Sequence, residues 1–424
     1  MSRNHPVYRM LLLGLALLAG VLLAPGAALG ADKLHLKDGR VLEGRVEKEI
    51  DGHVYFVVKV GSIEHTQFFS KDQITKLERD TPAAGAAAAE GTTAPAAGSP
   101  SAKPRAGEPK AGRPTRIAIL NFGPPSSWQG KVGNTVGIEI SAQAWKDAVP
   151  LLEKDNVDVV VVRINSGGGL LLELEKFHEA FQDHYKPKFR TVAWVESAIS
   201  AAAMSPWVIE EFYMMPEGNI GACTGWSGRL QAIAGISLEM VLAMMEDASA
   251  KGGHDYRIMR SMQIMEPLSA DIDDNGEVTW HQDLSGKYTV NPPEQILTFN
   301  ASDAVKFKFA KGIAATPDEL ARAMGYQEYE FAGKRAEEFI DQSMRDGDRT
   351  SKKLAEVYFK YQMAVQAAQQ EQDRTRRGAE VNRARNYLRE IKKYVKVNPN
   401  FQLMYPFDDE WFERQEEMLR DLMR

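Results

Sequence analysis

The segment from Asp158 to Ile164 reads Asp-Val-Val-Val-Val-Arg-Ile and is apolar at five of its seven positions. A strand with one wet face would alternate apolar and polar residues, so this run predicts a strand buried on both faces, as in a parallel sheet covered by helices. Helical spacing over residues 171–184, a strand over 191–195 and a helix over 200–210 follow. These repeated β-α-β units predict an α/β domain.

The first thirty residues have a different character from the rest of the chain. Basic residues precede the apolar run Met10–Leu23, and small residues follow it, which is typical of a secretory signal peptide over residues 1–30. We therefore expect export to a periplasmic or other extracytoplasmic location. The apolar run is short for a membrane-spanning helix, yet an uncleaved anchor that associates with a membrane remains open.

Composition divides the remaining chain into four segments. Strand-like alternation with Asp-Gly turn pairs predicts a small five-stranded, β-barrel-like module, and an Ala/Pro/Gly-rich stretch predicts a disordered linker. The strand–helix pattern then fills the main domain, and long amphipathic helices follow it. In chain order, the predicted boundaries are 31–79 for the module, 80–115 for the linker, 116–335 for the α/β domain and 336–424 for the helical extension.

Overall composition limits the classes of partner. The formal net charge is −6 over 424 residues, which argues against nucleic acid as the main partner. The one cysteine, Cys223, gives no disulfide framework. We expect neither a metal nor a cofactor, because His178 and His184 are predicted to be surface residues of one helix, and the acidic run Asp271–Glu277 fits a hairpin turn better than a calcium loop.

Three consecutive glycines close the strand that ends near Ile164. The run Ser166-Gly167-Gly168-Gly169 lacks Cβ atoms at three positions, so its backbone can adopt positive φ and be approached closely. Gly168 and Gly169 can present N–H groups to an anion where the next helix begins. A tight strand-to-helix turn that binds no ligand is the alternative interpretation.

A serine stands at the start of the next predicted helix. Ser200 is followed by Ala201, Ala202 and Ala203, which leave room for an approaching peptide carbonyl. The N–H of Ala201 could complete an oxyanion hole, although an ordinary helix N-cap is the alternative role of Ser200. Both signatures follow the carboxyl ends of strands, where ligands bind in open α/β sheets, so we expect them to lie close together.

Four stretches of this domain, in order along the chain, resemble the Clp-protease/crotonase superfamily. Within that superfamily they are most similar to NfeD-type and signal-peptide-peptidase-A-type serine peptidases, and the resemblance covers about 116–326. The stretches are Val160–Leu170 (with Gly167 where the family has proline), Ala198–Ala202, Glu211–Ala222 and Leu297–Ala314.

The resemblance implies a fold and a set of roles. The fold would be a Clp/crotonase-type spiral of β-α units, assembled as a homo-oligomer. Ser200 would be the nucleophile, Ala201 with Gly168 or Gly169 would donate to the oxyanion, and the substrate would be an extended peptide added as a strand.

The general base implied by the resemblance is missing from its expected places. Residues 222–250 contain no lysine or histidine, and 216–228 contain no histidine. The nearest substitutes are Lys251, His254 and Asp255, which follow a predicted helix over 238–250. A desolvated Glu196 and a base from a neighbouring subunit also remain open.

Three functions are therefore compatible with the sequence. The first is an exported serine endopeptidase that hydrolyses peptide bonds. The second is a catalytically inactive peptidase-fold scaffold that binds extended peptides in the same groove. The third is a crotonase-type acyl-thioester enzyme, against which the predicted export counts because such substrates are intracellular.

Overall fold

The computed structural model describes residues 32–37, 41–50, 53–60, 63–70, 74–79, 112–128, 131–227 and 231–424. The chain divides into two compact units, residues 1–100 and 101–424. The predicted signal peptide lies outside the described residues, as does the part of the predicted linker over 80–111. Within the described ranges, no helix combines the length and hydropathy needed to cross a bilayer.

The first unit contains an antiparallel sheet of five strands in the order β4-β3-β2-β1-β5. The strand number agrees with the prediction. The pairings among these described strands run from β4 to β5 without joining the two ends, so they form an open sheet. The strands are β1 (Asp32–Leu36), β2 (Val41–Ile50), β3 (His53–Val60), β4 (Ile63–Ser70) and β5 (Ile74–Glu78).

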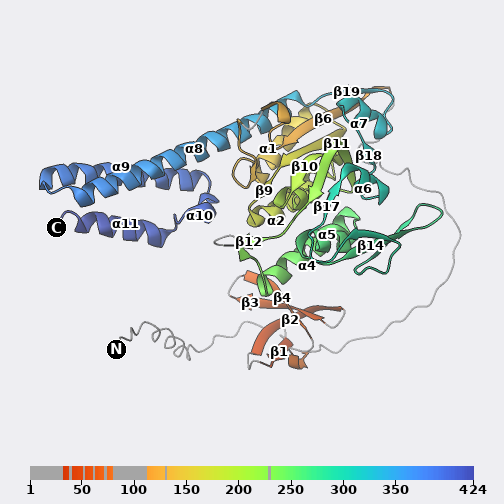
Figure 1. Cartoon of the computed structure of the whole chain (residues 1–424), viewed down its shortest axis with the longest axis horizontal. Helices are drawn as coiled ribbons and strands as arrows, with labels where there is room; N and C mark the ends of the chain where they lie inside the picture. Colours follow the sequence, from red (N-terminus) through yellow and green to blue (C-terminus); the bar gives the residue numbers. More distant parts are fainter. Residues whose placement is uncertain are drawn as a thin grey trace, which may run out of the picture. The chain divides into compact units, whose positions relative to one another are not determined.

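The second unit is built on a sheet of order β17-β11-β10-β8-β6-β19, with β18 also paired to β11 (Figure 1). All of its pairings are parallel except that of β17 with β11, which confirms the predicted parallel α/β domain. The strands are β6 (Thr115–Phe122), β8 (Val159–Ser166), β10 (Arg190–Ile199), β11 (Glu211–Gly221), β17 (Thr298–Asn300), β18 (Gly312–Ile313) and β19 (Tyr329–Phe331).

The apolar run of β8 is explained by a hydrophobic core on each face of the sheet. Val160 and Val162 belong to a core shared with α1 (Ala142–Lys154) and α2 (Leu174–Glu179). Val159 and Val161 belong to a second core with α7 (Pro317–Ala323). Alternate side chains thus enter opposite layers, which is why the first four residues of this strand are all valine.

The loops between the main strands carry smaller elements. The predicted helix over 171–184 is present as a 3-10 turn, α2 and a π-helical segment, whereas the predicted helix over 200–210 shortens to α3. The hairpin predicted at Asp271–Glu277 joins β14 to β15. The elements are β7 (Thr135–Val136), β9 (Gly168–Gly169), α3 (Ala201–Met204), β12 (Trp226–Ser227), β13 (Gln231–Ala232), α4 (Ile236–Gly252), α5 (Tyr256–Gln263), β14 (Leu268–Ile272), β15 (Val278–His281), β16 (Tyr288–Asn291) and α6 (Ala301–Lys306).

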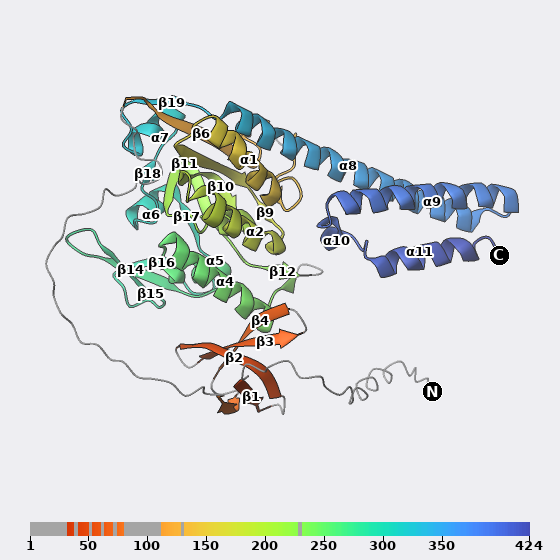
Figure 2. The same cartoon turned by 180° about the vertical axis from the view of Figure 1, so that it is seen from behind.

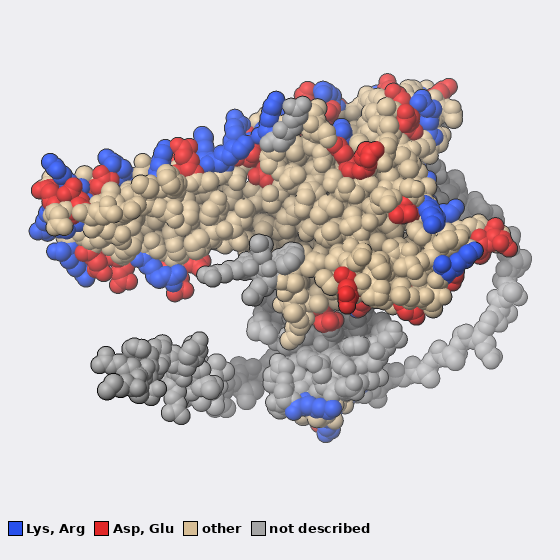
Figure 3. Space-filling view, in the orientation of Figure 1, with Lys and Arg blue, Asp and Glu red and all other residues tan. Residues whose placement is uncertain are grey.

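The C-terminal residues form the predicted amphipathic helices: α8 (Lys334–Gln370), α9 (Arg374–Val397), α10 (Phe401–Met404) and α11 (Asp409–Asp421). The start of α8 packs into the main core, and the helix then runs out beside α9 (Figure 2). We call α8 to α11 the C-terminal hairpin. Figure 3 shows both basic and acidic side chains along the edges of its visible face, with other residues between them. Ion pairs within the hairpin include Arg383–Glu380 and Arg385–Glu416.

Candidate active site

The strand register brings the two sequence signatures to one edge of the sheet. Ala198 of β10 pairs with Ser166 of β8, and Ile199 pairs with Gly221 of β11. The Ser200 N–H then donates to the Gly221 carbonyl at 3.0 Å. The glycine run and Ser200 therefore leave neighbouring strands at the same level, as the parallel topology predicts.

Gly168 lies directly against Ser200. A Cβ atom built on Gly168 would stand 2.7 Å from Ser200 Cβ and 3.1 Å from Ser200 Oγ. The φ of Gly168 is +105°, a conformation that residues with a Cβ rarely adopt. This position requires glycine for both reasons, and the structure brings the serine and the glycine run into contact.

The backbone of Ser200 is not that of an N-cap. Its φ of 56° and ψ of −129° differ from the extended conformation of a capping residue, and its side chain makes no capping hydrogen bond. A positive φ costs about 1–3 kcal/mol in a residue other than glycine and persists only where the surroundings enforce it. The surrounding structure therefore keeps Ser200 in a strained backbone conformation between β10 and α3. An ordinary N-cap residue would not have this strain.

The predicted oxyanion donors differ in their hydrogen bonding. The Gly168 N–H donates to Ser166 Oγ at 3.1 Å, and Ser166 Oγ in turn donates to the Asn134 carbonyl. Gly169 is exposed, and Ala201 occupies the first position of α3, where an N–H has no acceptor within the helix. Of the three predicted donors, Gly168 is therefore engaged within its own loop, Gly169 is exposed and Ala201 is buried.

Small buried side chains surround the backbone that follows Ser200. Ala201, Ala202 and Ala203 are fully buried, and the Cys223 thiol lies 3.7 Å from the Ser200 carbonyl oxygen. Burial raises the pKa of Cys223, so this cysteine is a packing thiol and not a thiolate nucleophile.

Large apolar side chains follow the glycine strand along the chain. Leu171 lies beside Gly225, where an added Cβ would stand 3.2 Å from Leu171 Cδ1 and 2.6 Å from Ile233 Cδ1. Leu172 is 67% exposed, and Ile236 at the start of α4 is 79% exposed. Exposed large apolar residues at the end of a glycine strand are suited to contact the side chains of a bound peptide.

Neither predicted base is placed near Ser200. His254 Nε2 lies 2.7 Å from the Ile209 carbonyl, just before the amino end of β11. Glu211 pairs with Val192 and Gly221 with Ile199, so the two ends of this strand pair are roughly 20 Å apart. Lys251 forms an ion pair with Asp247 at 2.6 Å on the exposed last turn of α4.

His254 packs among the rings of Trp207, Phe212 and Phe309. Desolvation lowers its pKa to about 4, although Glu210 opposes the shift. A base this weak is poorly matched to catalysis at neutral pH. His178 was expected at the surface, but it is buried with Nε2 at 2.9 Å from the Met204 carbonyl, so the prediction for this residue is wrong.

The depressed pKa of His254 predicts a pH-dependent stability. Between about pH 6.5 and 4 the unfolded chain binds a proton at this site and the folded chain does not, so stability falls as the pH falls through this window, by at most about 3 kcal/mol. Urea unfolding at pH 7.5 and 4.5 measures the loss. His254→Gln should reduce this pH dependence, and an unchanged pH dependence in that variant would disprove the assignment.

The Glu196 carboxylate interacts with neighbouring residues of the sheet and makes no hydrogen bond to Ser200. It sits at the irregularity in β10, where its carboxylate pairs with Arg163 at 2.9 Å and accepts from Asn165 at 3.2 Å. In the part of the chain that the structure describes, Ser200 Oγ has no hydrogen bond to a lysine, a histidine or a carboxylate. The same described residues hold no cluster of three His, Cys, Asp or Glu side chains placed to bind a metal.

One part of the site was absent from the sequence interpretation. Residues Thr135–Val136 form β7, which pairs in parallel with the glycine strand β9, and Leu170 N–H donates to the Val136 carbonyl at 2.9 Å. The segment lies between β6 and α1 and has no regular hydrophobic period. Its pairing with the glycines depends on the tertiary fold, so periodicity could not reveal it.

Comparison with known proteins supports the predicted resemblance. No protein-family model matches the chain. Membrane protein NfeD1b of Bacillus subtilis (strain 168) is 25% identical over 191 residues, which is 45% of this chain and 39% of that protein. The chain therefore spans well under half the length of this relative, and the predicted similarity to NfeD-type proteins is confirmed.

Solved structures similar to this one include two variants of the 1510-N membrane-bound stomatin-specific protease, the second in complex with a substrate peptide. They are 14% and 15% identical, cover 50% of this chain and 86% and 81% of their own, and have TM-scores of 0.35 and 0.36. A variant of ClpP1 from Listeria monocytogenes is 16% identical, covers 48% of this chain and 94% of its own, and has a TM-score of 0.28.

Proposed function

We propose that this protein is a serine endopeptidase-like enzyme in which Ser200 Oγ attacks the carbonyl carbon of an extended peptide. The observation that carries the proposal is the conformation of Ser200, a half-buried residue with positive φ whose side chain lies against Gly168 and makes no capping hydrogen bond to α3. Backbone strain of this kind concentrates at functional sites.

The proposed reaction follows from the groups at the corner. As Oγ bonds to the carbonyl carbon, its proton leaves to a base and negative charge develops on the carbonyl oxygen. The N–H groups of Gly169 and Ala201 would donate to that oxygen, and such donors contribute several kcal/mol to lowering a barrier. Collapse expels the amine, which takes up the proton from the base, and water then hydrolyses the acyl ester to release the acid and regenerate the Ser200 hydroxyl.

The proton acceptor is the unassigned part of the proposal. Lys251, His254 and Glu196 are engaged elsewhere. In a homo-oligomer, which the family resemblance predicts, a neighbouring copy could supply the base.

We also propose export and membrane association through residues 1–30. Fractionating cells and sequencing the amino terminus of the recovered protein tests this proposal.

A second candidate function is favoured by the lack of a base among the described neighbours of Ser200. Without proton removal a serine hydroxyl is a poor nucleophile. The same corner would then act as a peptide-binding scaffold, with the ligand lying along the glycine strand and its apolar side chains against Leu171 and Leu172.

Hydrolysis of a library of internally quenched peptides tests the two functions. For a peptidase, Ser200→Ala should lower kcat/KM by at least about 10³-fold. Ser197→Ala, three residues earlier on β10 with its hydroxyl 3.0 Å from Asn219 Oδ1, should stay within about twofold as the matched control. A wild-type protein that binds library peptides and cleaves none of them would overturn the peptidase proposal in favour of the scaffold.

A further inference from the structure

The C-terminal hairpin contacts the loop over residues 131–141, which contains strand β7. Asn398 and Asn400 lie in the connection between α9 and α10, and their side-chain amides donate to the Gly137 carbonyl at 3.1 Å and 2.9 Å. Gly137 directly follows β7, and β7 pairs with the glycine strand β9. Asn398 and Asn400, about 260 residues from Gly137 in sequence, thus hold the residue that follows β7.

Apolar contacts reinforce this grip on both strands. Ile138 is only 4% exposed and belongs to the hydrophobic core of the hairpin, together with Leu354, Leu388 and Phe401. Leu170, the residue after Gly169, packs against the same core. The hairpin therefore contacts the end of β7 and the end of β9 at once.

Helix α8 makes further hydrogen bonds to the same loop. Its Asp348 Oδ1 accepts from the Gly133 N–H at 3.0 Å, and its Lys352 Nζ donates to the Lys131 carbonyl at 3.1 Å. A Cβ built on Gly347 would stand 2.8 Å from the Ile138 carbonyl oxygen, so glycine is needed for the helix to approach. Within the loop, the buried Glu139 accepts from the Thr135 N–H at 2.9 Å.

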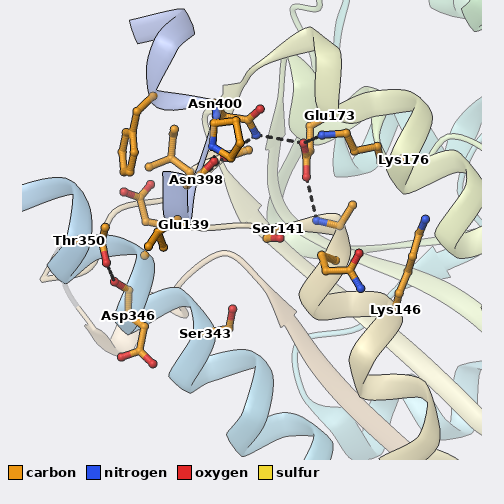
Figure 4. A pocket seen from close by; sticks show the side chains of 18 residues that line it. Glu139, Ser141, Lys146, Glu173, Lys176, Ser343, Asp346, Thr350, Asn398 and Asn400 are labelled. Atoms are coloured by element: carbon orange, nitrogen blue, oxygen red, sulfur yellow. Dashed lines mark hydrogen bonds and ion pairs between the residues drawn. The ribbon is translucent and has the colours of Figure 1, made fainter. Parts of the chain in front are cut away.

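A cavity lies between the C-terminal hairpin and this loop. A cavity of about 500 Å³ is lined by Ser343, Asp346 and Thr350 of α8, by Asn398 and Asn400, and by Glu139, Ser141 and Lys146 of the α/β domain (Figure 4). Asn400 also donates to Glu173, which pairs with Lys176. Beside this cavity the loop is held by directed hydrogen bonds, in addition to the apolar contacts of Ile138.

We infer that Asn398 and Asn400 are positioning residues of the candidate active site, acting through Gly137 and β7 on the glycine strand that faces Ser200. The inference rests on the proposed function for its catalytic consequence, whereas the mechanical link stands on the contacts alone. An oxyanion donor displaced by about 1 Å can cost on the order of 100-fold in rate. The hairpin would then set how well Gly169 is aligned with Ala201.

Asn400→Asp tests the link with almost no change in side-chain size. The new carboxylate would face the Gly137 carbonyl and Glu173, both of which are acceptors, so the contact becomes repulsive. We expect kcat for the quenched peptides to fall by about 10- to 100-fold with KM within about twofold. Amide hydrogen exchange over 134–140 and 167–171 should rise about tenfold or more, with β10 and β11 unchanged. Asn382→Asp, exposed on α9, is the matched control.

Gly347→Ala is the second variant. Alanine favours a helix more than glycine does, so any loosening of the loop must come from the clash with Ile138. Gly378→Ala on α9 is its control, since the added Cβ meets only the flexible end of Met423.

The outcomes separate the inference from the proposed function. Unchanged exchange over 134–140 and 167–171 in both variants, or a rise spread over the whole domain, would overturn the inference. A wild-type protein without hydrolysis would overturn the peptidase proposal, and local loosening in both variants would then still support the mechanical link.

Discussion

Replacing Ser200 by glycine is expected to stabilise the fold by about 1 kcal/mol while it removes the proposed nucleophile. The φ of 56° costs a serine about 1–3 kcal/mol, and glycine adopts this conformation without that cost. The larger backbone entropy of glycine in the unfolded chain offsets about 0.5–1 kcal/mol of the gain. Peptide hydrolysis should fall at least about 10³-fold, because no hydroxyl remains.

Ser200→Ala is the control for this gain, since alanine keeps the Cβ and therefore the strain. Denaturant unfolding of the three proteins gives the comparison, and Ser200→Gly should be the most stable. If Ser200→Gly is instead less stable than Ser200→Ala, as at an ordinary helix start, then the positive φ of Ser200 is not present in solution.

Gly168→Ala is expected to destabilise the protein by about 2–4 kcal/mol and to abolish hydrolysis. The new methyl group would stand 2.8 Å from the Ile199 carbonyl oxygen and 2.7 Å from Ser200 Cβ, in a backbone with φ of +105°. Strain and overpacking each cost about 1–3 kcal/mol at such positions. Relief of the clash must move Ser200 away from the glycine run, so the site is lost with the stability.

Gly167→Ala provides a matched control one residue away. A Cβ on Gly167 meets nothing within 4 Å, and its φ lies outside the range that excludes side chains. This variant should keep its stability within about 0.5 kcal/mol and its hydrolysis within about twofold. Equal effects of the two substitutions would contradict the contact between Gly168 and Ser200.

The parallel sheet and the core of the site were predictable from the sequence because they depend on local patterns. The apolar run of β8 enters two hydrophobic layers, which requires helices on both faces. A glycine run after one parallel strand and Ser200 after the next must meet at the carboxyl edge, and the register of β8 with β10 places them together. Length and hydrophobic period also indicated the C-terminal helices.

Contacts between distant segments were not predictable in the same way. His254 follows α4 in sequence, yet the chain returns it to the amino end of β11, among aromatic rings. The grip of Asn398 and Asn400 on Gly137 joins segments that share no pattern. The positive φ of Ser200 is equally absent from any sequence pattern, and it occurs where Ser200 is hydrogen-bonded to Gly221 and followed by the buried Ala201 to Ala203.

Covalent labelling with a fluorophosphonate probe, followed by peptide mapping, tests most directly whether Ser200 is a nucleophile facing an oxyanion hole. The account predicts one adduct, on the peptide that contains Ser200. Labelling should disappear in Ser200→Ala and Gly168→Ala and persist in Ser197→Ala and Gly167→Ala. A wild-type protein that takes up no probe at Ser200, in its assembled state and at neutral pH, would contradict the account.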